Sequence, residues 1–355
     1  MKIGIPREIK VLEGRVVLTP VAVGELVKHG QQVFIEQNAG LLSGYSDKEY
    51  SDAGATLLNS AKAVYASSEL IVKVKEPQKA ELKLLKKEHI LFSFLHLAAA
   101  PDLTEQLVNI GLTAVAFETV TINKQLPLLA PMSDIAGRIA VQVGTHLLHQ
   151  PQGGRGILLG GVGGVSETAI EKGKVVILGG GIAGSGATQI ASALGADVIV
   201  FDPNAEKRKQ LEAMGQNITA KHPLEQDIEQ AVKQADLLIG AVLIPGTKTP
   251  HLVSAELVKA MKAGSVIIDI SVDQGGCIET TRPTTYEAPT FVWEDVIHFG
   301  VTNMPGAVPR TSTQALSAAL LPYVLQLCEA DWQSNPALSS GINVQYGKII
   351  LPTLV

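Results

Sequence analysis

The sequence predicts an α/β protein made of two doubly wound domains, each built on a mostly parallel sheet. Short apolar, β-branched runs alternate with helix-compatible segments along most of the chain, a pattern typical of parallel sheets covered by helices on both faces. A glycine-rich motif stands between one such run and the helix expected after it. The 355 residues are also enough for two domains with sizeable cores.

The glycine-rich motif follows a run that reads as a buried strand, Lys174–Leu178. Gly179, Gly181 and Gly184 then give the pattern Gly-x-Gly-x-x-Gly. The first glycine would allow the tight turn, the second the approach of a pyrophosphate, and the third close packing of helix on strand. The helix expected over Ser185–Leu194 would turn free N–H groups and the positive end of its dipole toward the phosphates.

An acidic residue completes this motif. Asp202 follows the apolar run 196–201 and lies 202 − 184 = 18 residues after Gly184. A carboxylate there can accept hydrogen bonds from an adenosine ribose, and its charge would repel the 2′-phosphate of NADP. Strand, glycines, helix, second strand and acid together predict a Rossmann domain that binds NAD, in preference to a glycine-rich turn in some other βαβ unit.

Composition argues against several classes of protein. The formal net charge is −5 at pH 7, so no basic surface for nucleic acid or an anionic membrane is expected. The two cysteines, Cys277 and Cys328, form neither a metal-binding spacing nor a disulfide framework, which fits a reducing cytoplasm. The start of the chain lacks the pattern of a signal peptide, and runs such as Leu237–Ile244 are too short to span a bilayer.

The first domain is expected over residues 1–128. Thr19 is expected to cap a helix that begins at Pro20 and ends before Gly30. The segment Ser51–Ser60 is expected to start a further helical stretch. The expected strands are residues 2–5, 32–36, 70–74, 90–97 and 114–118.

The second domain, the Rossmann domain, is expected over residues 129–305. Ser133 is expected to cap a connecting helix that continues to about His149. The glycine-dense segment Gly153–Val165 is interpreted as a hairpin or wall element, because no helix-compatible segment of useful length follows it before Lys174. The later strands are expected at 237–242, 266–270 and 296–301, with helices at 224–235 and 254–262.

The last part of the chain breaks the alternation. Thr311–Cys328 is a long apolar helical pattern with Pro322 inside it, and such a helix cannot extend the nucleotide sheet. We therefore expect residues 306–355 to return to the first domain, which makes that domain discontinuous.

Several stretches together resemble a known family. They are Gly4–Lys10 with Glu13, Arg15 and Thr19-Pro20, then Val72–Pro77, Leu95–Ala98, Pro127–Met132, Ile239–Gly246, Asp273–Cys277, Thr281–Thr285 and Asn303–Thr313. Nearly from end to end, the chain resembles the alanine dehydrogenase family. The resemblance implies reversible NAD-dependent oxidative deamination of L-alanine to pyruvate and ammonia, by a cytoplasmic homohexamer whose discontinuous domain carries the substrate and catalytic residues.

The resemblance also implies four residues for the chemistry. Arg15 and Lys75 would bind the substrate, and His96 and Asp273 would be catalytic. Without the resemblance, Arg15 would read as a surface arginine, Lys75 as part of a solvated strand face shared with Lys73, and His96 as a core histidine. A histidine pKa near 6.5 suits proton exchange at neutral pH. Asp269 competes with Asp273 on spacing alone, and the match to Asp-Gln-Gly-Gly selects Asp273.

The cofactor contacts implied by the resemblance include the three motif glycines. The set is Ser133, Gly179, Gly181, Ile182, Ala183, Gly184, Asp202, Lys207, Val242, Leu243, Ser271, Val272, Asp273, Arg282, Val301, Thr302, Asn303 and Met304. Ser133 can serve both as a contact and as a helix cap, and Arg208 lies beside Lys207 as a second candidate for the adenosine side.

The chain departs from the family pattern in places that concern the cofactor and a metal. Gly186 stands near an Asn that many members have, and His222-Pro223 stands where a serine is usual near the adenine. Some members carry a metal-binding acid and histidine in the late helix. This chain has Gln326 and Ala330 there, so no metal is expected.

Two other functions stay open at this stage. One is a dehydrogenase of another small amino acid, and the other is the NAD-binding module of a transhydrogenase-like complex. The second would need membrane-spanning segments or a partner chain, and it would not need Arg15, Lys75, His96 and Asp273 together.

Overall fold

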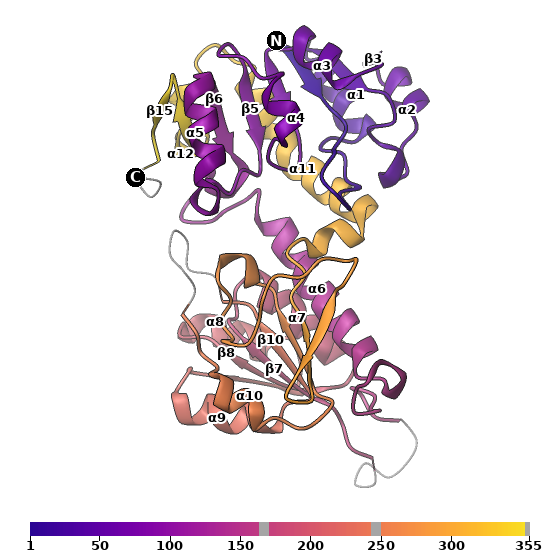
Figure 1. Ribbon diagram of the computed structural model, residues 1–355, viewed down its shortest axis with the longest axis vertical. Helices are drawn as coiled ribbons and strands as arrows, with labels where there is room; N and C mark the ends of the chain where they lie inside the picture. The colour runs from indigo at the N-terminus through magenta and orange to yellow at the C-terminus, as the bar shows by residue number, and fades with distance from the viewer. Residues whose placement is uncertain (163–169, 243–249, 352–355) are drawn as a thin grey trace. The chain divides into compact units, whose positions relative to one another are not determined.

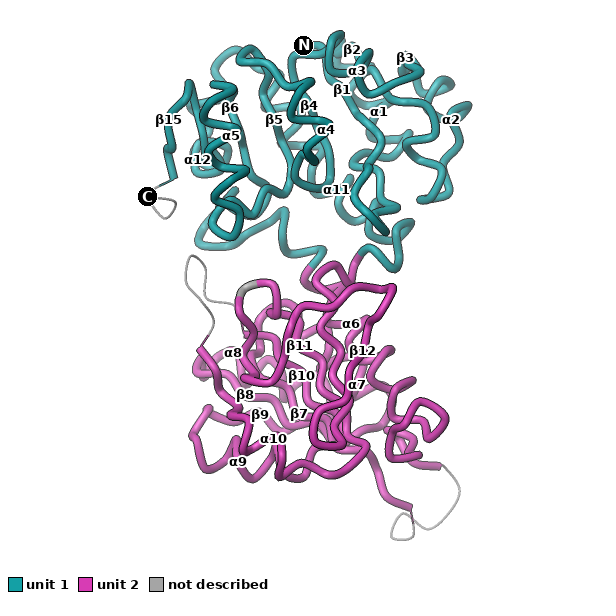
Figure 2. Tube along the Cα trace, viewed as in Figure 1, with its two compact units in different colours: residues 1–132, 306–355 teal, residues 133–305 magenta. Residues whose placement is uncertain are grey.

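The chain forms two compact units, one with residues 1–132 and 306–355 and one with residues 133–305 (Figure 2). The computed structural model describes residues 1–162, 170–242 and 250–351. Each unit has one mostly parallel sheet flanked by helices (Figure 1), which confirms the predicted fold class. The predicted boundary after residue 128 lies in the loop before helix α6 (Ala130–Leu147), and the two units divide inside that helix, between residues 132 and 133.

The sheet of the first unit has the order β15-β14-β6-β5-β4-β1-β2-β3. Its strands from β3 to β6 are parallel, and β14 and β15 add an antiparallel edge. The direction of the strand order reverses between β1 and β4, the point where ligands collect in doubly wound sheets. The bounds are β1 (Lys2–Ile5), β2 (Gln32–Glu36), β3 (Thr56–Leu58), β4 (Leu70–Val72), β5 (Ile90–Ser93), β6 (Thr113–Ala116), β14 (Ile342–Gln345) and β15 (Lys348–Ile349).

Helices flank this sheet (Figure 1), and the late helix α11 packs against α1. Thr19 caps α1 by accepting a hydrogen bond from the N–H of Ala22. The backbone N–H groups of Val16 and Thr19 donate to Thr313 and Ser317 of α11, which joins the end of the chain to its beginning. The helices are α1 (Pro20–Lys28), α2 (Asp47–Asp52), α3 (Ala61–Ser67), α4 (Lys79–Leu82), α5 (Pro101–Ile110), α11 (Pro309–Leu327) and α12 (Pro336–Ser340). The 3₁₀ turns are η1 (Leu41–Ser43), η2 (Leu97–Ala99), η3 (Phe117–Thr119) and η7 (Trp332–Ser334).

The sheet of the second unit has the order β12-β13-β11-β10-β7-β8-β9. All its pairs are parallel except β12 with β13, and the order reverses between β7 and β10. This is the dinucleotide-binding arrangement of strands. The bounds are β7 (Lys174–Leu178), β8 (Asp197–Phe201), β9 (Ile218–Lys221), β10 (Leu237–Gly240), β11 (Val266–Asp269), β12 (Thr290–Trp293) and β13 (Val296–Phe299).

Its core lies between the sheet and its helices. One continuous cluster joins strand residues such as Val176, Leu238 and Ile267 to Ile228 and Val258 of the covering helices. The helices are α6, α7 (Ile182–Ala193), α8 (Ala205–Glu212), α9 (Glu225–Gln234) and α10 (Ala255–Lys259), with 3₁₀ turns η4 (Gln150–Gln152), η5 (Val272–Gln274) and η6 (Met304–Ala307).

Two expectations about helix positions are wrong. Ser133 does not cap α6, because the helix already begins at Ala130, and Pro131 in its first turn needs no hydrogen-bond acceptor. The helical stretch expected to start within Ser51–Ser60 is instead the end of α2, a turn at Gly54 with φ of +94°, and strand β3. A capping box between Ser46 and Glu49 starts α2 earlier than the sequence pattern indicated.

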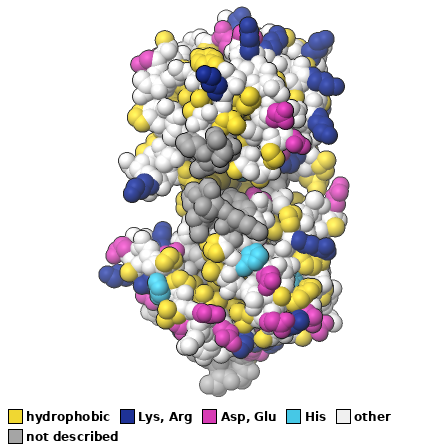
Figure 3. Space-filling model, turned by 60° about the vertical axis from the view of Figure 1, so that its left-hand side comes forward, with side chains coloured by type: hydrophobic (Ala, Val, Ile, Leu, Met, Phe, Trp, Pro, Cys, Tyr) yellow, Lys and Arg dark blue, Asp and Glu magenta, His cyan; other side chains and the backbone are white. Residues whose placement is uncertain are grey.

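The glycine-dense segment after α6 contains no strand in its described part, residues 153–162. Its last residues, 163–165, lie outside the described residues. Among the helices of the described residues, none is long and apolar enough to cross a membrane. The face in Figure 3 carries both basic and acidic side chains, with apolar ones between them.

Candidate active site

Three of the residues expected to act on the substrate lie beyond the carboxyl ends of neighbouring strands in the first sheet. Arg15 follows β1, Lys75 follows β4, and His96 follows β5. Because these strands are parallel and adjacent around the switch point, their carboxyl ends meet at one edge of the sheet. The carboxyl ends of these strands therefore bring two cationic side chains and one imidazole to the place where a ligand is expected.

Arg15 is buried and held in one orientation. Its side chain is 2% exposed, and it makes a two-point ion pair with Glu13, from Nε to Oε1 at 2.6 Å and from Nη2 to Oε2 at 2.5 Å. Nη1 contacts the sulfur of Met132 at 3.2 Å. Because Glu13 binds the Nε and Nη2 side of the guanidinium, the group is already oriented to bind a planar carboxylate. Arg15 is thus not the surface arginine that composition alone favours.

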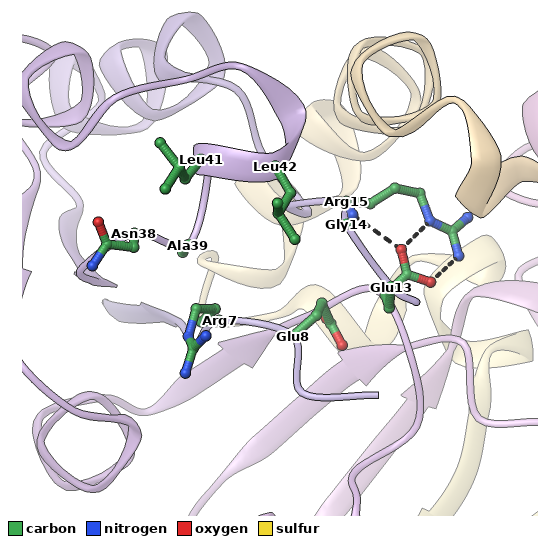
Figure 4. Close-up of a pocket in the computed structure, with 9 residues that line it drawn as sticks. All are labelled: Arg7, Glu8, Glu13, Gly14, Arg15, Asn38, Ala39, Leu41 and Leu42. Atoms are coloured by element: carbon green, nitrogen blue, oxygen red, sulfur yellow. Dashed lines mark hydrogen bonds and ion pairs between the residues drawn. The ribbon is translucent and has the colours of Figure 1, made fainter. Parts of the chain in front are cut away.

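A cavity lies on the same unit beside the Glu13–Arg15 pair (Figure 4). Its volume is about 180 Å³. In the close-up, the carboxylate of Glu13 faces the guanidinium of Arg15, and Glu8 lies on the neighbouring segment (Figure 4). The lining residues are Arg7, Glu8, Glu13, Gly14, Arg15, Asn38, Ala39, Leu41 and Leu42.

Lys75 and Lys73 have different surroundings. Strand β4 ends at Val72, so the two lysines are not on a strand face, and neither is solvated, since Lys73 is 0% and Lys75 9% exposed. Lys73 Nζ makes ion pairs with Glu8 at 2.9 Å and Glu81 at 3.4 Å, and it donates to the carbonyl oxygen of Lys75 at 3.0 Å. Burial alone would lower the pKa of Lys73, but these two carboxylates outweigh burial and raise it.

The Lys73 network fixes the backbone of Lys75. Glu8 accepts hydrogen bonds from the N–H groups of Val74 at 2.5 Å and Lys75 at 3.4 Å. The pKa of Lys75 itself is lowered, first by burial and then by the positive charges of Arg15 and Lys10. Lys75 is therefore a buried ammonium next to a second cation, a pair that favours the binding of an anion.

His96 has an unusual backbone. Its φ of +49° and ψ of +41° are left-handed, which is uncommon for a non-glycine residue and frequent at functional sites. Glu118 stabilises this turn by accepting hydrogen bonds from the N–H of His96 at 2.6 Å and of Leu95 at 3.2 Å. The imidazole stacks on the ring of Phe94, with centroids 5.9 Å apart and an interplanar angle of 7°. Sequence reasoning missed Glu118, because only the fold brings it beside His96.

The glycine loop of the second unit has the geometry that a dinucleotide needs. Gly179 has a φ of +94° at the end of β7. A Cβ on Gly181 would meet no atom within 4 Å, whereas one on Gly184 would collide with the carbonyl oxygen of Gly179. Open space thus lies above Gly181 at the start of α7, and the loop fits the pyrophosphate of a dinucleotide.

Asp202 lies beside this loop at the end of β8. Its Oδ2 accepts a hydrogen bond from the N–H of Gly180 at 2.9 Å, and its Oδ1 accepts one from the N–H of Asn204 at 2.8 Å. Each carboxylate oxygen keeps further acceptor capacity. The guanidinium of Arg208 donates to the backbone oxygens of Asp202 and Pro203, so Arg208 packs against the turn that carries Asp202, while Lys207 donates its backbone N–H to Asn204.

The remaining predicted cofactor residues follow β10, β11 and β13 or begin α6 and α7. Ser133 lies inside the first turn of α6, and Ile182 and Ala183 begin α7. Leu243 lies outside the described residues. After β10 comes Val242; after β11 come Ser271, Val272 and Asp273; and after β13 come Val301, Thr302, Asn303 and Met304. These residues lie on the carboxyl edge of the second sheet, as Gly179 and Asp202 do.

Arg282 and Asp273 have distinct settings within this unit. The guanidinium of Arg282 lies over the ring of Phe291 at 4.5 Å, and that ring stacks on His298 at 4.8 Å. Asp273 is exposed, whereas its competitor Asp269 is 0% exposed. Among the described residues, no group of three or more His, Cys, Asp or Glu side chains is placed to hold a metal ion.

Two family models match the chain. "Alanine dehydrogenase/PNT, N-terminal domain" matches residues 4–136, and "Alanine dehydrogenase/PNT, C-terminal domain" matches residues 140–352. Among curated proteins, alanine dehydrogenase of Mycobacterium tuberculosis strain H37Rv is 48% identical over 99% of this chain and 95% of its own length. Alanine dehydrogenase of Bacillus subtilis strain 168 is 47% identical over 98% of this chain and 92% of its own length.

Solved structures show the same similarity. An L-alanine dehydrogenase superposes with a TM-score of 0.94 at 50% identity, covering 100% of this chain and 98% of its own. A transhydrogenase from Sinorhizobium meliloti superposes with a TM-score of 0.84 at 22% identity, covering 99% of each chain. The second likeness is one of fold.

Proposed function

The chain belongs to the alanine dehydrogenase family, and from this premise we propose that it interconverts L-alanine and pyruvate by reversible NAD-dependent oxidative deamination, with release of ammonia. The observation that supports this most is the buried cationic edge of the first sheet, where Arg15 and Lys75 are held by Glu13 and Glu8 beside the strand that leads to His96.

The reaction makes separate demands on the site. In the direction of alanine synthesis, pyruvate and ammonia condense to an imine with loss of water, and the imine carbon then gains a hydride. A carboxylate must be held throughout, and protons must move to and from the substrate oxygen and nitrogen. The reduced cofactor, NADH, would supply this hydride when bound, and NAD⁺ would accept it in the reverse direction.

We assign the substrate carboxylate to Arg15. Its guanidinium suits a planar carboxylate, and Glu13 fixes its orientation before substrate arrives. Lys75 would polarise the carbonyl oxygen of pyruvate, because it is a buried ammonium whose backbone the Lys73–Glu8 pair restrains. Such fixed charges stabilise developing negative charge without reorganising water.

We assign proton transfer to His96 and Asp273. His96 would exchange a proton with the substrate oxygen, and its left-handed backbone, held by Glu118, aims the ring. Asp273, the exposed acid in the turn after β11, would act on the nitrogen side. In the carbinolamine and imine steps, His96 would thus transfer protons at the substrate oxygen and Asp273 at the substrate nitrogen.

We propose NAD rather than NADP as the cofactor. Asp202 lies beside the glycine loop with acceptor capacity left for a ribose. Its negative charge would repel a 2′-phosphate.

We also propose a cytoplasmic homohexamer, in line with the resemblance. Helix α11 buries Leu316, Leu320 and Val324 within its own unit, so these side chains are not free to form an apolar interface. Exposed apolar side chains elsewhere in this unit, among them Val21 and Leu42 at 77% and 72% exposure, are better placed to meet another copy. Light scattering of the purified chain measures the assembly directly.

The test of function is an assay of NADH oxidation with ammonium across a panel of 2-oxo acids. Pyruvate should be the preferred acceptor over its longer and branched homologues. Preference for another 2-oxo acid would mean that the enzyme acts on a different small amino acid and not on alanine. Hydride exchange between dinucleotides without any 2-oxo acid would favour the transhydrogenase-like module instead.

A further inference from the structure

A buried carboxylate with no role in the proposed reaction lies at the end of β11. Asp269 is 0% exposed and accepts four hydrogen bonds. Oδ1 accepts from the N–H of Ser271 at 3.0 Å. Oδ2 accepts from the N–H of Cys277 at 2.9 Å, the N–H of Ile278 at 3.3 Å and the hydroxyl of Thr281 at 2.9 Å.

These four donors lie on both sides of the segment that carries Asp273. Ser271 precedes the 3₁₀ turn η5, and Cys277, Ile278 and Thr281 follow it. The carboxylate therefore holds the two ends of the loop 271–281 together. Oδ1 binds Ser271 where the loop begins, and Oδ2 binds residues 277, 278 and 281 where it ends. Three proposed cofactor or catalytic residues, 271–273, lie inside this closed loop.

The surroundings are shaped around the carboxylate. Gly276 has a φ of +70°, and a Cβ there would lie 2.6 Å from Oδ2. On the neighbouring strand, a Cβ on Gly240 would lie 2.9 Å from Oδ1. Any side chain at Gly276 or Gly240 would thus clash with a carboxylate oxygen of Asp269. The site therefore fits a carboxylate and leaves it little room to move.

None of the four donors carries a charge. Burial raises the pKa of Asp269, and its hydrogen bonds with Thr281 and the three backbone N–H groups oppose that rise. An amide in its place would turn an NH₂ group toward N–H donors and leave buried donors unpaired, a loss that proteins tolerate poorly.

We propose that Asp269 is a positioning residue for catalysis, which holds the loop 271–281 so that Asp273 and the cofactor contacts Ser271 and Val272 meet the reacting atoms. The proposal rests on the function proposed above. Because Asp269 is 0% exposed, it would act through this loop, and we assign substrate affinity to the other unit. A loosened loop should therefore lower kcat and weaken NADH binding, with little change in KM for pyruvate.

The experiment compares two equally buried carboxylates at opposite ends of the second sheet. Asp236 is also 0% exposed, but it precedes β10 and pairs with Arg155 and Lys262. At saturating NADH, Asp269→Asn should lower kcat about tenfold or more while KM for pyruvate stays within about twofold. Asp236→Asn should lower the melting temperature yet keep kcat within about twofold, since its network lies away from the loop.

A milder pair keeps the test decisive if Asp269→Asn does not fold. Thr281→Val removes one of the four donors at nearly constant shape, and Thr281→Ser restores the hydroxyl. Thr281→Val should lower kcat about threefold or more, and Thr281→Ser should recover it. A folded Asp269→Asn variant with the parent's kcat, or a Thr281→Val variant with the parent's kcat, would overturn the proposal.

Failure of the proposed function would be seen separately. If the parent chain did not reduce pyruvate, the role of the loop would be measured by NADH titration, because Ser271 and Val272 lie within it. Asp269→Asn should then weaken NADH binding about threefold or more, relative to Asp236→Asn. Equal NADH affinity in these two variants would overturn the proposal by this route as well.

Discussion

The backbone N–H of His96 donates to Oε1 of Glu118 at 2.6 Å, and this hydrogen bond holds the proposed catalytic histidine in a left-handed turn. A left-handed non-glycine residue costs about 1–2 kcal/mol, so the conformation persists only because its surroundings support it. Glu118 stands on the next strand's 3₁₀ turn, and the parallel pairing of β5 with β6 brings it there.

Removing that support should reduce turnover. We expect Glu118→Ala to lower kcat about tenfold, because His96 loses the acceptor that fixes its turn, while Glu118→Gln, which keeps one acceptor oxygen, should lose less. Glu105→Ala, on the exposed face of α5, is the matched control. Steady-state kinetics would contradict this role if Glu118→Ala and Glu105→Ala had equal kcat.

Replacing the histidine itself separates chemistry from folding. We choose His96→Asn beside His96→Ala because Asn tolerates the left-handed region. Both variants should lose most of their turnover while NADH binding, which we assign to the other unit, stays intact. Unchanged turnover in His96→Asn would refute the catalytic role of the imidazole.

The Lys73 network should be worth several kcal/mol. Lys73→Met leaves the carboxylates of Glu8 and Glu81 buried without their cation, a change that typically costs about 3–5 kcal/mol. In the control Lys48→Met, an exposed pair with Asp52 is lost, which should cost no more than about 0.5 kcal/mol. Urea unfolding of both variants measures the difference, and equal losses of stability would contradict the assigned network.

Substrate affinity should fall at alkaline pH. The pKa of Lys75 is lowered by burial and by Arg15 and Lys10, so its ammonium loses its proton at a lower pH than the ordinary 10.5. An anion that binds beside it should therefore bind more weakly as the pH rises toward 10.5. We would measure oxamate, a non-reacting analogue of pyruvate, against the NADH complex. Parallel curves for the parent and Lys75→Gln would contradict the assignment.

Cofactor choice should depend on Asp202. We expect Asp202→Ser to relax the preference for NAD over NADP, because the charge that repels the 2′-phosphate is gone. The ratio of kcat/KM for the two cofactors is the measurement, with Glu206→Ser on the exposed face of α8 as the control. An unchanged ratio in Asp202→Ser would remove the ribose assignment.

Much of the fold could be predicted because strong local signals agreed with the tertiary structure. Lys174–Leu178 forms β7 with the predicted bounds, since a β-branched run ends at a glycine with positive φ. Short edge strands such as β9 and β12 escaped prediction, because their exposed or half-buried residues give no apolar run. The predictions for Ser133 and the segment 51–60 are wrong because Pro131 lies in the first turn of α6, which begins at Ala130, and a capping box starts α2 at Asp47.

The residues of the candidate site also divide into those that the sequence predicts and those that only the fold brings together. The motif glycines and Asp202 could be found from spacing, because they lie on one continuous βαβ unit. The partners Glu118 and Glu8 could not, because each reaches its loop across strands that are distant in sequence. Burial separates Asp269 from Asp273, whereas Lys73 and Lys75 are both buried and differ in that Lys73 pairs with Glu8 and Glu81. No periodicity along the chain encodes either difference.

The most direct test of the proposed reaction follows the nitrogen atom of ammonia into the product. The purified chain is given pyruvate, NADH and ¹⁵N-ammonium, and the product is identified by NMR while NADH oxidation is recorded. We predict ¹⁵N-labelled L-alanine, formed in step with the NADH consumed and lost in the His96→Asn variant. NADH oxidation that yields lactate, or no labelled alanine at all, would contradict it.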